Sequence, residues 1–265
     1  MDLDFADKTV IVTGGSRGIG LATAATFAAE GARVFAGSRT VTDELAELRR
    51  RHDVTHVPAD LATTDGVATL IDTAVAARGG IDVLVNNVAT SEPAESVVAF
   101  SDEQWQRVFD TTLFSAVRTV RRAVPAMLGR KGASIVTIGS LNARLPAAMI
   151  APYSAAKAAL ANYTKALSEE LAPQGIRVNA VSPGPVRTPL WTGPGGFAHL
   201  LAEQAGTTPD DVMDRLLPES MAITTGRVSE PDEVARLVAF LASDQAGNIT
   251  GVDYVIDGGM QKHVA

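Results

Sequence analysis

The stretch TGGSRGIG, residues 13–20, lies between an apolar run, TVIVT at residues 9–13, and a helical pattern over about residues 19–30. Glycine permits a sharp turn and a close approach of the backbone to a phosphate group. The first turn of a helix offers free N–H groups and a partial positive charge. A glycine pattern between the first strand and first helix of a βαβ unit is typical of dinucleotide-binding proteins. We therefore expect a pyrophosphate to bind around Gly14, Ser16, Arg17, Gly18, Ile19 and Gly20.

Short apolar runs alternate with longer helical patterns along the rest of the chain. Most runs are rich in β-branched residues and apolar on both alternating faces, as in a parallel sheet that helices cover on both sides. They predict strands at Thr9–Thr13, Arg33–Ala36, Val54–Val57, Ile81–Val85, Ser134–Ile138, Arg177–Val181 and Asp253–Ile256. Helices are predicted at about 19–30, 42–51, 64–78, 101–129, 153–173 and 230–242. This alternation indicates an α/β fold, a Rossmann-like, doubly wound parallel sheet of about seven strands with helices on both faces.

One segment, about residues 188–226, departs from this alternation. It contains Trp191, the hinge-like GPGG at residues 193–196 and two short helical patterns. Ligands in open α/β sheets lie at the carboxyl ends of the strands, where this segment starts, so we expect a short helical lid over a substrate. A packed surface excursion is the alternative. No linker-like change in composition interrupts the chain, and we expect residues 1–265 to form a single dinucleotide-binding and catalytic domain.

Composition argues against several classes of function. The 265 residues are 46% hydrophobic and 20% charged, with a net charge of −7, a sign that repels nucleic-acid phosphates and anionic lipid. The chain has no cysteine, which excludes disulfides, thiolate catalysis and cysteine-ligated metals. The acidic N-terminus and the lack of an apolar run of roughly 18 residues predict no secretory signal and no membrane helix, hence a cytoplasmic protein. The four histidines are dispersed, and we expect no metal site.

The second predicted strand ends in AGSRT, residues 36–40. Folds that select NAD carry an acid near this position to bind the ribose 2′-hydroxyl. This chain instead has Ser38 and Arg39 here, with Arg17 in the glycine turn, and arginine binds phosphate through a bidentate fork. We therefore expect NADP(H), with NAD(H) as the alternative. Asp60 and Leu61, after the third strand, are expected beside the cofactor, where Asp60 could accept from the adenine amine or cap the next helix.

The glycine turn also fits a second motif. Gly14-Gly15-Ser16-Arg17-Gly18 matches G-x-S-x-G, the nucleophile elbow of α/β-hydrolases, with Asp257 and His263 in the right order to serve as partners. The strand before it begins almost at the N-terminus, where an elbow strand should have other strands before it. No HGGG-like oxyanion loop is present, and His263 lies two residues from the end of the chain. We therefore favour the dinucleotide interpretation.

Over essentially its full length the chain resembles the short-chain dehydrogenase/reductase family. The matching pieces are TGGSRGIG at 13–20, Asn86-Asn87, Ser140, Tyr153-x-x-x-Lys157, PGPVRT at 183–188 and ITGVDYVIDGG at 249–259. The resemblance implies that Ser140, Tyr153 and Lys157 are catalytic. It also implies further cofactor contacts from Asn87, Tyr153, Lys157, Pro183, Gly184, Val186 and Thr188.

The Tyr153-x-x-x-Lys157 motif suits proton transfer, because residues four apart share one face of a helix. A free phenol has a pKa near 10. An ammonium about 4 Å away favours the phenolate by roughly 4 kcal/mol at an effective dielectric of 20, or about three pKa units. We therefore expect Lys157 to lower the pKa of Tyr153, which acts as acid in carbonyl reduction and base in alcohol oxidation. Ser140 is expected to stabilise the substrate oxygen, and the resemblance implies that Lys157 holds the nicotinamide ribose.

Two positions depart from the family pattern. The usual Asn-Asn-Ala-Gly is Asn86-Asn87-Val88-Ala89 here, and we expect Ala89 to adopt an ordinary backbone conformation. The family's fourth catalytic residue, an asparagine that kinks a helix and supports a water-linked proton relay to the lysine, falls at Thr112. Threonine has a hydroxyl but no amide, so we expect it to slow turnover without abolishing it.

The sequence thus predicts an NADP(H)-dependent oxidoreductase that moves a hydride between nicotinamide and the carbonyl or secondary alcohol of a small molecule. The alternative is an NADP(H)-binding sensor or scaffold with weak or no catalysis, which Thr112 and the altered Asn86-Asn87-Val88-Ala89 segment motivate. The alanine-rich helix at 153–173 is compatible with the dimer contact that the resemblance implies, and we expect a homodimer or homotetramer. The substrate pocket should be mainly apolar, with walls from residues 88–92 and 142–149 and from lid residues such as Leu190, Trp191, Phe197 and Met221.

Overall fold

The computed structural model of the protein describes residues 3–262. Seven parallel strands form one sheet in the order β3-β2-β1-β4-β5-β6-β7. Every predicted strand is confirmed, with shifts of a few residues at some ends. The strands are β1 (Thr9–Thr13), β2 (Arg33–Ser38), β3 (Val54–Pro58), β4 (Val83–Asn86), β5 (Ser134–Ile138), β6 (Arg177–Pro183) and β7 (Asp253–Ile256).

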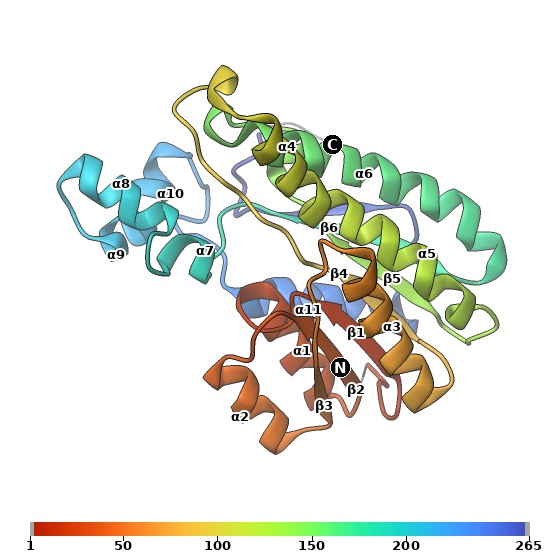
Figure 1. Ribbon diagram of the computed structural model, residues 1–265. Coiled ribbons are helices and arrows are strands. Elements are labelled where there is room, and N and C mark those ends of the chain that lie inside the picture. The colour runs from red at the N-terminus through yellow and green to blue at the C-terminus, as the bar shows by residue number, and fades with distance from the viewer. Residues whose placement is uncertain (1–2, 263–265) are drawn as a thin grey trace.

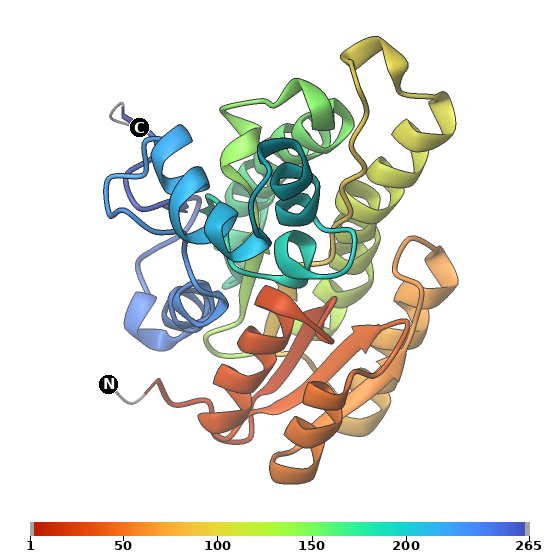
Figure 2. The ribbon, with the colours of Figure 1, turned by 90° about the vertical axis from the view of Figure 1, so that its left-hand side faces the viewer.

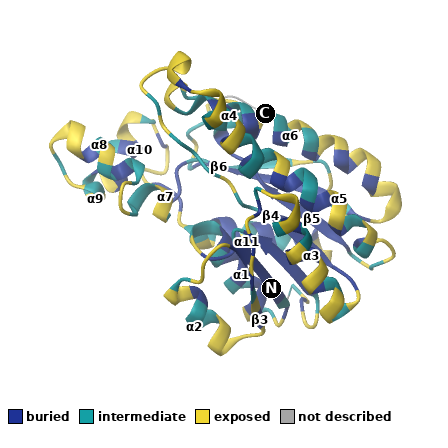
Figure 3. Ribbon diagram, viewed as in Figure 1, coloured by how far each residue is buried: buried dark blue, intermediate teal, exposed yellow. Residues whose placement is uncertain are grey.

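Helices cover both faces of the sheet, as predicted (Figures 1 and 2). One face packs against α1 (Gly18–Ala29), α2 (Asp43–Arg51) and α11 (Pro231–Ala242). The other packs against α3 (Thr64–Arg78), α5 (Ser115–Met127) and α6 (Ala151–Leu171). Strand β1 shows why both layers form, since Val10 and Val12 enter the first core and Ile11 enters the second. The strands are accordingly buried along most of their length (Figure 3).

The helix predicted over residues 101–129 is interrupted. It consists of α4 (Asp102–Phe109), a π-helical turn η2 (Asp110–Phe114) and then α5. Thr112 in this turn is fully buried, and its hydroxyl hydrogen-bonds the backbone of Thr90, at 3.3 Å to the nitrogen and 3.3 Å to the oxygen. A side chain that bonds a neighbouring segment from within the helix locally disturbs the i→i−4 ladder, which the sequence periodicity alone does not reveal.

The segment after β6 forms a small helical subassembly. It contains α7 (Pro189–Thr192), α8 (Phe197–Ala205), α9 (Pro209–Asp211), the π-helical turn η6 (Val212–Leu216) and α10 (Leu217–Ser220), and it projects beyond the sheet at the left of Figure 1. It has a core of its own that includes Ala198, Val212, Met213 and Leu217. Short 3₁₀ turns occur elsewhere, at Val97–Ala99, Leu141–Ala143, Ala148–Ile150, Ala172–Gln174 and Asp244–Ala246.

The turn between β1 and α1 requires glycine for two reasons. Gly14 has φ +68°, in the left-handed region that side chains avoid. Gly20 lies against the same turn, and a Cβ there would come within 2.2 Å of the Gly14 carbonyl oxygen and 2.5 Å of Asn87 Nδ2. The close approach of these backbone segments shapes the cradle that the sequence predicted.

Replacing Gly20 with alanine should therefore destabilise the fold through collision. We expect Gly20→Ala to lower the free energy of unfolding by about 3 kcal/mol, as overpacking does. Gly79→Ala is the matched control, because Gly79 has φ +73° but a Cβ added to it would meet no atom within 4 Å, and it should cost about 1 kcal/mol. Urea unfolding of both variants measures the difference, and equal costs would contradict the collision.

Candidate active site

The predicted site residues lie along one edge of the sheet. Because all the strands run parallel, their carboxyl ends meet at that edge. The glycine turn follows β1, Asn87 follows β4 and Ser140 follows β5. Ser38 ends β2, Asp60 follows β3 and Pro183 ends β6. The fold therefore brings segments that are far apart in the sequence to a common edge.

Asn87 ties the end of β4 to the glycine turn. Its side-chain amide donates to the carbonyl oxygens of Thr13, at 2.8 Å, and Gly14, at 3.3 Å. In return, the Thr13 hydroxyl oxygen accepts from the backbone N–H groups of Asn87, at 2.8 Å, and Val88, at 3.1 Å. Among residues 3–262 the non-glycine residues with positive φ are Asp4, Asp7 and Ala222, so the expectation that Ala89 is unstrained is confirmed.

The first turn of α1 is suited to an anion. The helix starts at Gly18, has no acidic residue in its first turn, and receives no side-chain cap from Arg17. Its free N–H groups and positive dipole end therefore stay available. The loop after β6 lies against this turn, because a Cβ on Gly18 would come within 3.2 Å of Thr188 Cγ2. Earlier in the same loop, the buried Val186 forms a bridge with Ser229.

The end of β2 adjoins the glycine turn on its other side. The backbone N–H groups of Gly14 and Gly15 donate to the Gly37 carbonyl oxygen at 2.8 and 3.3 Å. Ser38 is buried there, and its hydroxyl donates to the Thr40 carbonyl oxygen at 2.9 Å. Arg39, which follows Ser38, is exposed.

An acid that the sequence reasoning did not consider also lies near the predicted phosphate position. A hydrogen bond from the Glu44 backbone N–H is the main cause that lowers the pKa of the Glu44 carboxyl, and the nearby Thr42 hydroxyl and the charge of Arg17 act in the same direction. Thr42 also caps α2 and donates its hydroxyl proton to the Ser16 carbonyl oxygen at 2.8 Å. The start of α2 is therefore fastened to the glycine turn and carries Glu44 toward Arg17.

Asp60 and Leu61 differ in part from expectation. The side chain of Thr63, rather than that of Asp60, caps α3 by accepting from the Gly66 N–H at 3.0 Å. The Asp60 carboxylate accepts from the Ala62 N–H at 3.1 Å, and the residue is exposed at the sheet edge. The Leu61 side chain is buried in the core beside α3, which leaves its backbone as the part that could contact a cofactor.

Lys157 fills a gap that strand β4 leaves. Strand β4 ends at Asn86, opposite Thr137 of β5, and so does not pair with Ile138. The Lys157 side chain donates from Nζ to the Ile138 carbonyl oxygen at 2.6 Å and is almost completely buried. The same Nζ lies 5.6 Å from the ring centroid of Tyr153, one helical turn earlier on α6.

Ser140 completes the predicted catalytic group. Its hydroxyl lies near enough to the Tyr153 phenol to act on the pKa of that phenol, which it lowers. Asn142, which sequence reasoning placed only in the pocket wall, holds Ser140 in place: its backbone N–H donates to Ser140 Oγ at 3.1 Å, and Ser140 Oγ donates to its side-chain oxygen at 3.3 Å. No signal in the sequence distinguishes Asn142 from other loop asparagines.

The expected direction of the Tyr153 pKa is wrong for this structure. Burial raises the pKa of the Tyr153 phenol, and the nearby Ser140 hydroxyl opposes that rise only in part. Burial also lowers the pKa of Lys157 to about 7, so the amine carries a full positive charge only below neutral pH. The expectation assumed that Lys157 is charged because it lies one helical turn from Tyr153. Burial instead favours the neutral form of both the amine and the phenol. Tyr153 is thus held as a protonated phenol, the form that donates a proton.

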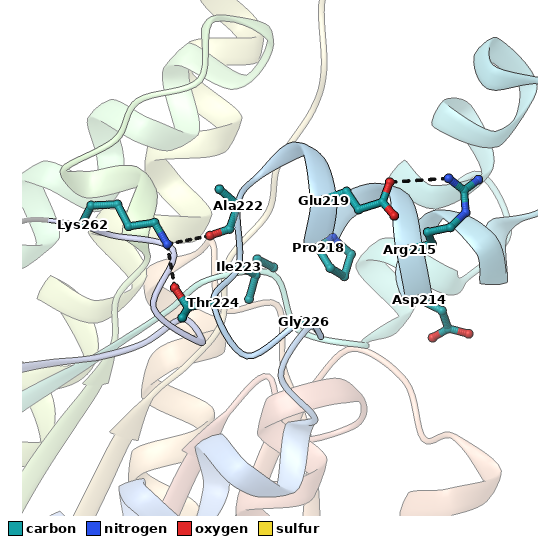
Figure 4. A pocket seen from close by; sticks show the side chains of 9 residues that line it. All are labelled: Asp214, Arg215, Pro218, Glu219, Ala222, Ile223, Thr224, Gly226 and Lys262. Atoms are coloured by element: carbon teal, nitrogen blue, oxygen red, sulfur yellow. Dashed lines mark hydrogen bonds and ion pairs between the residues drawn. The ribbon is translucent and has the colours of Figure 1, made fainter.

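A cavity of about 540 Å³ lies under α10 and the loop that follows it (Figure 4). Its walls include Pro218, Ile223 and Lys262, and the Lys262 ammonium donates to the Ala222 carbonyl and the Thr224 hydroxyl, both at 2.7 Å. None of the predicted catalytic residues lines this cavity. Residues expected in the walls of the substrate pocket pack against the helical subassembly and are partly buried there: Trp191 contacts Phe197 with ring centroids 5.5 Å apart, and Trp191 and Met221 both pack against the local core.

The alternatives considered from sequence find little support. The Asp257 carboxylate, a potential hydrolase partner, accepts from the backbone N–H groups of Gly259 at 2.9 Å and Gln261 at 2.7 Å, and His263 lies outside the described residues. The first strand is nevertheless internal to the sheet, so its early position was a poor argument against the elbow. Across residues 3–262 no group of three metal-ligating side chains occurs, and no helix has the length and apolar character needed to cross a bilayer.

Comparison with known proteins gives concordant matches. The family model described as enoyl-(acyl carrier protein) reductase matches residues 14–261. A 3beta-hydroxysteroid dehydrogenase 1 from Eggerthella lenta is 38% identical over 263 residues, covering 97% of this chain and 95% of that protein. Dehydrogenase/reductase SDR family member 4 from Homo sapiens is 34% identical, covering 96% and 87%. The crystal structure of L-sorbose reductase from Gluconobacter frateurii, complexed with NADPH and L-sorbose, is similar with a TM-score of 0.92 and 34% identity over all of both chains.

The buried amine predicts a pH dependence of stability. The pKa of Lys157 is about 7 in the folded chain, against about 10.4 in an unfolded one. Between these values the unfolded chain binds more protons, so the free energy of unfolding rises with pH. Relative to Lys157→Met, the wild type should gain up to about 1.4 kcal/mol per pH unit from pH 7 to pH 10.

Urea unfolding at each pH measures this gain. Lys165→Met is the matched control, because Lys165 lies on the same helix with its side chain 60% exposed beside Glu169. Its stability difference from the wild type should stay flat across the same range. Parallel curves for the wild type and Lys157→Met would contradict the lowered pKa of the buried amine.

Proposed function

The chain belongs to the short-chain dehydrogenase/reductase family, NAD(P)-dependent oxidoreductases that act on alcohol and carbonyl groups, and from that premise we propose that it prefers NADP(H) and transfers protons through Tyr153. The proposal rests on one observation: Ser140, Tyr153 and Lys157 lie together at the same edge of the sheet as the glycine cradle.

The glycine cradle fits a dinucleotide. Its glycines stand where side chains would collide, and the helix behind it has an uncapped, acid-free first turn. Gly14, Ser16, Gly18, Ile19 and Gly20 would surround the pyrophosphate, with Thr188 from the opposite loop. Asn87, Asp60, the Leu61 backbone and Pro183, Gly184 and Val186 would hold the rest of the cofactor. When bound, the nicotinamide ring supplies or accepts the hydride.

Preference for NADP(H) rests on the residues near the end of β2. Arg17 and Arg39 supply two guanidinium groups, and Ser38 supplies a neutral donor for the 2′-phosphate. Glu44 opposes them with a negative charge near Arg17, so NAD(H) is the second candidate cofactor. The complex of the similar L-sorbose reductase with NADPH supports the first choice.

In carbonyl reduction, Tyr153 donates its phenolic proton to the substrate oxygen while the carbonyl carbon gains a hydride. The π bond of the carbonyl breaks, and a C–H and an O–H bond form. A phenol is protonated at neutral pH and burial raises its pKa further, and the Ser140 hydroxyl hydrogen-bonds the substrate oxygen as charge builds on it. Lys157 returns a proton toward the phenol and would hold the nicotinamide ribose. Alcohol oxidation reverses each step.

Thr112 bears on how fast these steps run. Its single hydroxyl makes both hydrogen bonds to Thr90, each 3.3 Å long, and keeps the π-helical turn beside the start of α6. A break in the regular helix is therefore present at the position where the family pattern places the asparagine. A nucleotide sensor without chemistry is the weaker candidate function, because the Ser140, Tyr153 and Lys157 group is complete.

Three further properties belong to this proposal. Residues 188–226 act as a lid whose own core lets it move as a unit. The chain forms one domain. It assembles as a homodimer or homotetramer through α6, on which Ala158 is exposed and Ala155, Ala159 and Ala161 are partly exposed. Light scattering of the purified chain tests the assembly.

Replacing Tyr153 with phenylalanine removes the transferable proton and keeps the ring. We expect the turnover number in carbonyl reduction to fall by about 10³-fold, with the Kd for NADPH within about twofold of the wild type. A panel of ketones, quinones, 3-oxoacyl thioesters and sugars supplies the substrate. Tyr163→Phe, on the same helix, is the control and should keep full turnover. Equal turnover in Tyr153→Phe would overturn the assignment.

Restoring the family asparagine tests Thr112. An amide can bond the Thr90 nitrogen and oxygen with separate atoms, whereas the hydroxyl shares both. Thr112→Asn should therefore raise the turnover number by about fivefold, which is about 1 kcal/mol of activation free energy. Thr112→Val, similar in shape but without the hydroxyl, should lower it. Turnover that is unchanged in Thr112→Asn would show that Thr112 does not limit the reaction.

A further inference from the structure

We propose that His56 determines the preference for NADP(H) by orienting the Ser38 hydroxyl toward the cofactor's 2′-phosphate, an inference that rests on the proposed function. His56 lies in β3, pairs in register with Ala36 of β2, and is partly buried. It belongs to no metal group among the described residues, and the sequence reasoning gave it no role. Its position beside the end of β2 gives it one.

The imidazole reaches Ser38 at two atoms. His56 Nε2 lies 3.0 Å from the Ser38 carbonyl oxygen and 3.0 Å from Ser38 Oγ. A carbonyl oxygen can only accept a hydrogen bond, so Nε2 must carry a proton in this arrangement. The same N–H is therefore shared with Ser38 Oγ, which acts as an acceptor toward His56. Only the tautomer with a proton on Nε2 turns both contacts into hydrogen bonds, and we assign that tautomer on this ground.

This assignment decides where the hydroxyl proton goes. Ser38 Oγ cannot donate to a nitrogen that already carries a proton, so its own proton must point away from β3. It is donated to the Thr40 carbonyl oxygen at 2.9 Å, in the loop that carries Arg39 and leads to Thr42, whose hydroxyl bonds the glycine turn. His56 thus keeps the hydroxyl proton off β3 and on the side of the Thr40 carbonyl, and the proton turns from that carbonyl to a phosphate oxygen when the cofactor binds.

A 2′-phosphate needs such a donor. Its oxygens accept hydrogen bonds and offer none when fully ionised, whereas the 2′-hydroxyl of NAD(H) can both donate and accept. An outward O–H group therefore favours the phosphate. Without the His56 N–H, Ser38 Oγ would lose its inner partner and turn freely among its rotamers. The charges of Arg17 and Arg39 attract the 2′-phosphate and the pyrophosphate alike. The placement of the Ser38 hydroxyl proton is what favours a cofactor with a 2′-phosphate.

The Kd values of the full-length chain for NADPH and NADH, measured by nicotinamide fluorescence, test this role. We expect His56→Leu to weaken NADPH binding about tenfold and NADH binding less than twofold. His56→Gln, which keeps a side-chain N–H, should stay within about threefold for NADPH. The control is His52→Leu, because His52 is exposed four residues earlier, and it should leave both Kd values unchanged. The two cofactors differ only in the 2′-phosphate, so damage to the fold would weaken both.

A double-mutant cycle tests whether His56 acts through Ser38. Ser38→Ala should weaken NADPH binding about as much as His56→Leu does, and adding His56→Leu to Ser38→Ala should change it less than twofold. His56→Val replaces the leucine variant if that one unfolds. Equal loss for both cofactors, or a full tenfold loss in the Ser38→Ala background, overturns the role of His56. A wild type that binds NADH as tightly as NADPH contradicts the proposed cofactor preference itself, before any variant is compared.

Discussion

The hydrogen bond from Lys157 Nζ to the Ile138 carbonyl oxygen, 2.6 Å long, fastens the first turns of α6 to the end of β5. It exists because β4 stops at Asn86 and turns toward the glycine turn, where Asn87 takes the carbonyls of Thr13 and Gly14. The end of β4 at Asn86 thus shapes two parts of the site. It ties the nucleotide cradle to the middle of the sheet, and it leaves a carbonyl that only a long side chain from the neighbouring helix can reach.

Burying the Lys157 amine to form that bond costs free energy, because the charged amine loses its contact with water. Burying an amine with one carbonyl partner disfavours its charged form, and the same environment disfavours phenolate at Tyr153. A folded chain built only for stability would place an apolar residue at position 157. Here the desolvation keeps a neutral phenol next to an amine that exchanges its proton near neutral pH. Burial of this pair, to which we assign proton transfer, therefore reduces the free energy of unfolding, and the short bond from Lys157 to β5 holds the pair in place.

Sequence patterns predicted the strands well because a strand buried on both faces shows its environment in its own residues, as TVIVT at 9–13 does. They also located Ser140, Tyr153 and Lys157 through motif spacing. They failed where the outcome depends on contacts between distant segments. The π-helical turn holds Thr112 against Thr90, and Glu44 lies near Arg17 beside the bond from Thr42 to Ser16. The pKa of Tyr153 moved opposite to expectation because spacing reports proximity but not burial.

The arrangement separates the parts of the site that can vary from those that cannot. The sheet connects the glycine cradle to Ser140, Tyr153 and Lys157. A shift of Asn87 or Lys157 would leave the backbone carbonyls that they bond without a hydrogen-bond donor. Trp191 and Met221 instead pack against the core of the helical segment after β6, and Trp191 also contacts Phe197. Substitutions on the lid's outer surface, where Leu190 is 45% exposed, therefore leave the proton-transfer geometry untouched. Under the proposed function, substrate choice would then lie in a segment with a core of its own, while the residues proposed for hydride and proton transfer lie at the strand ends.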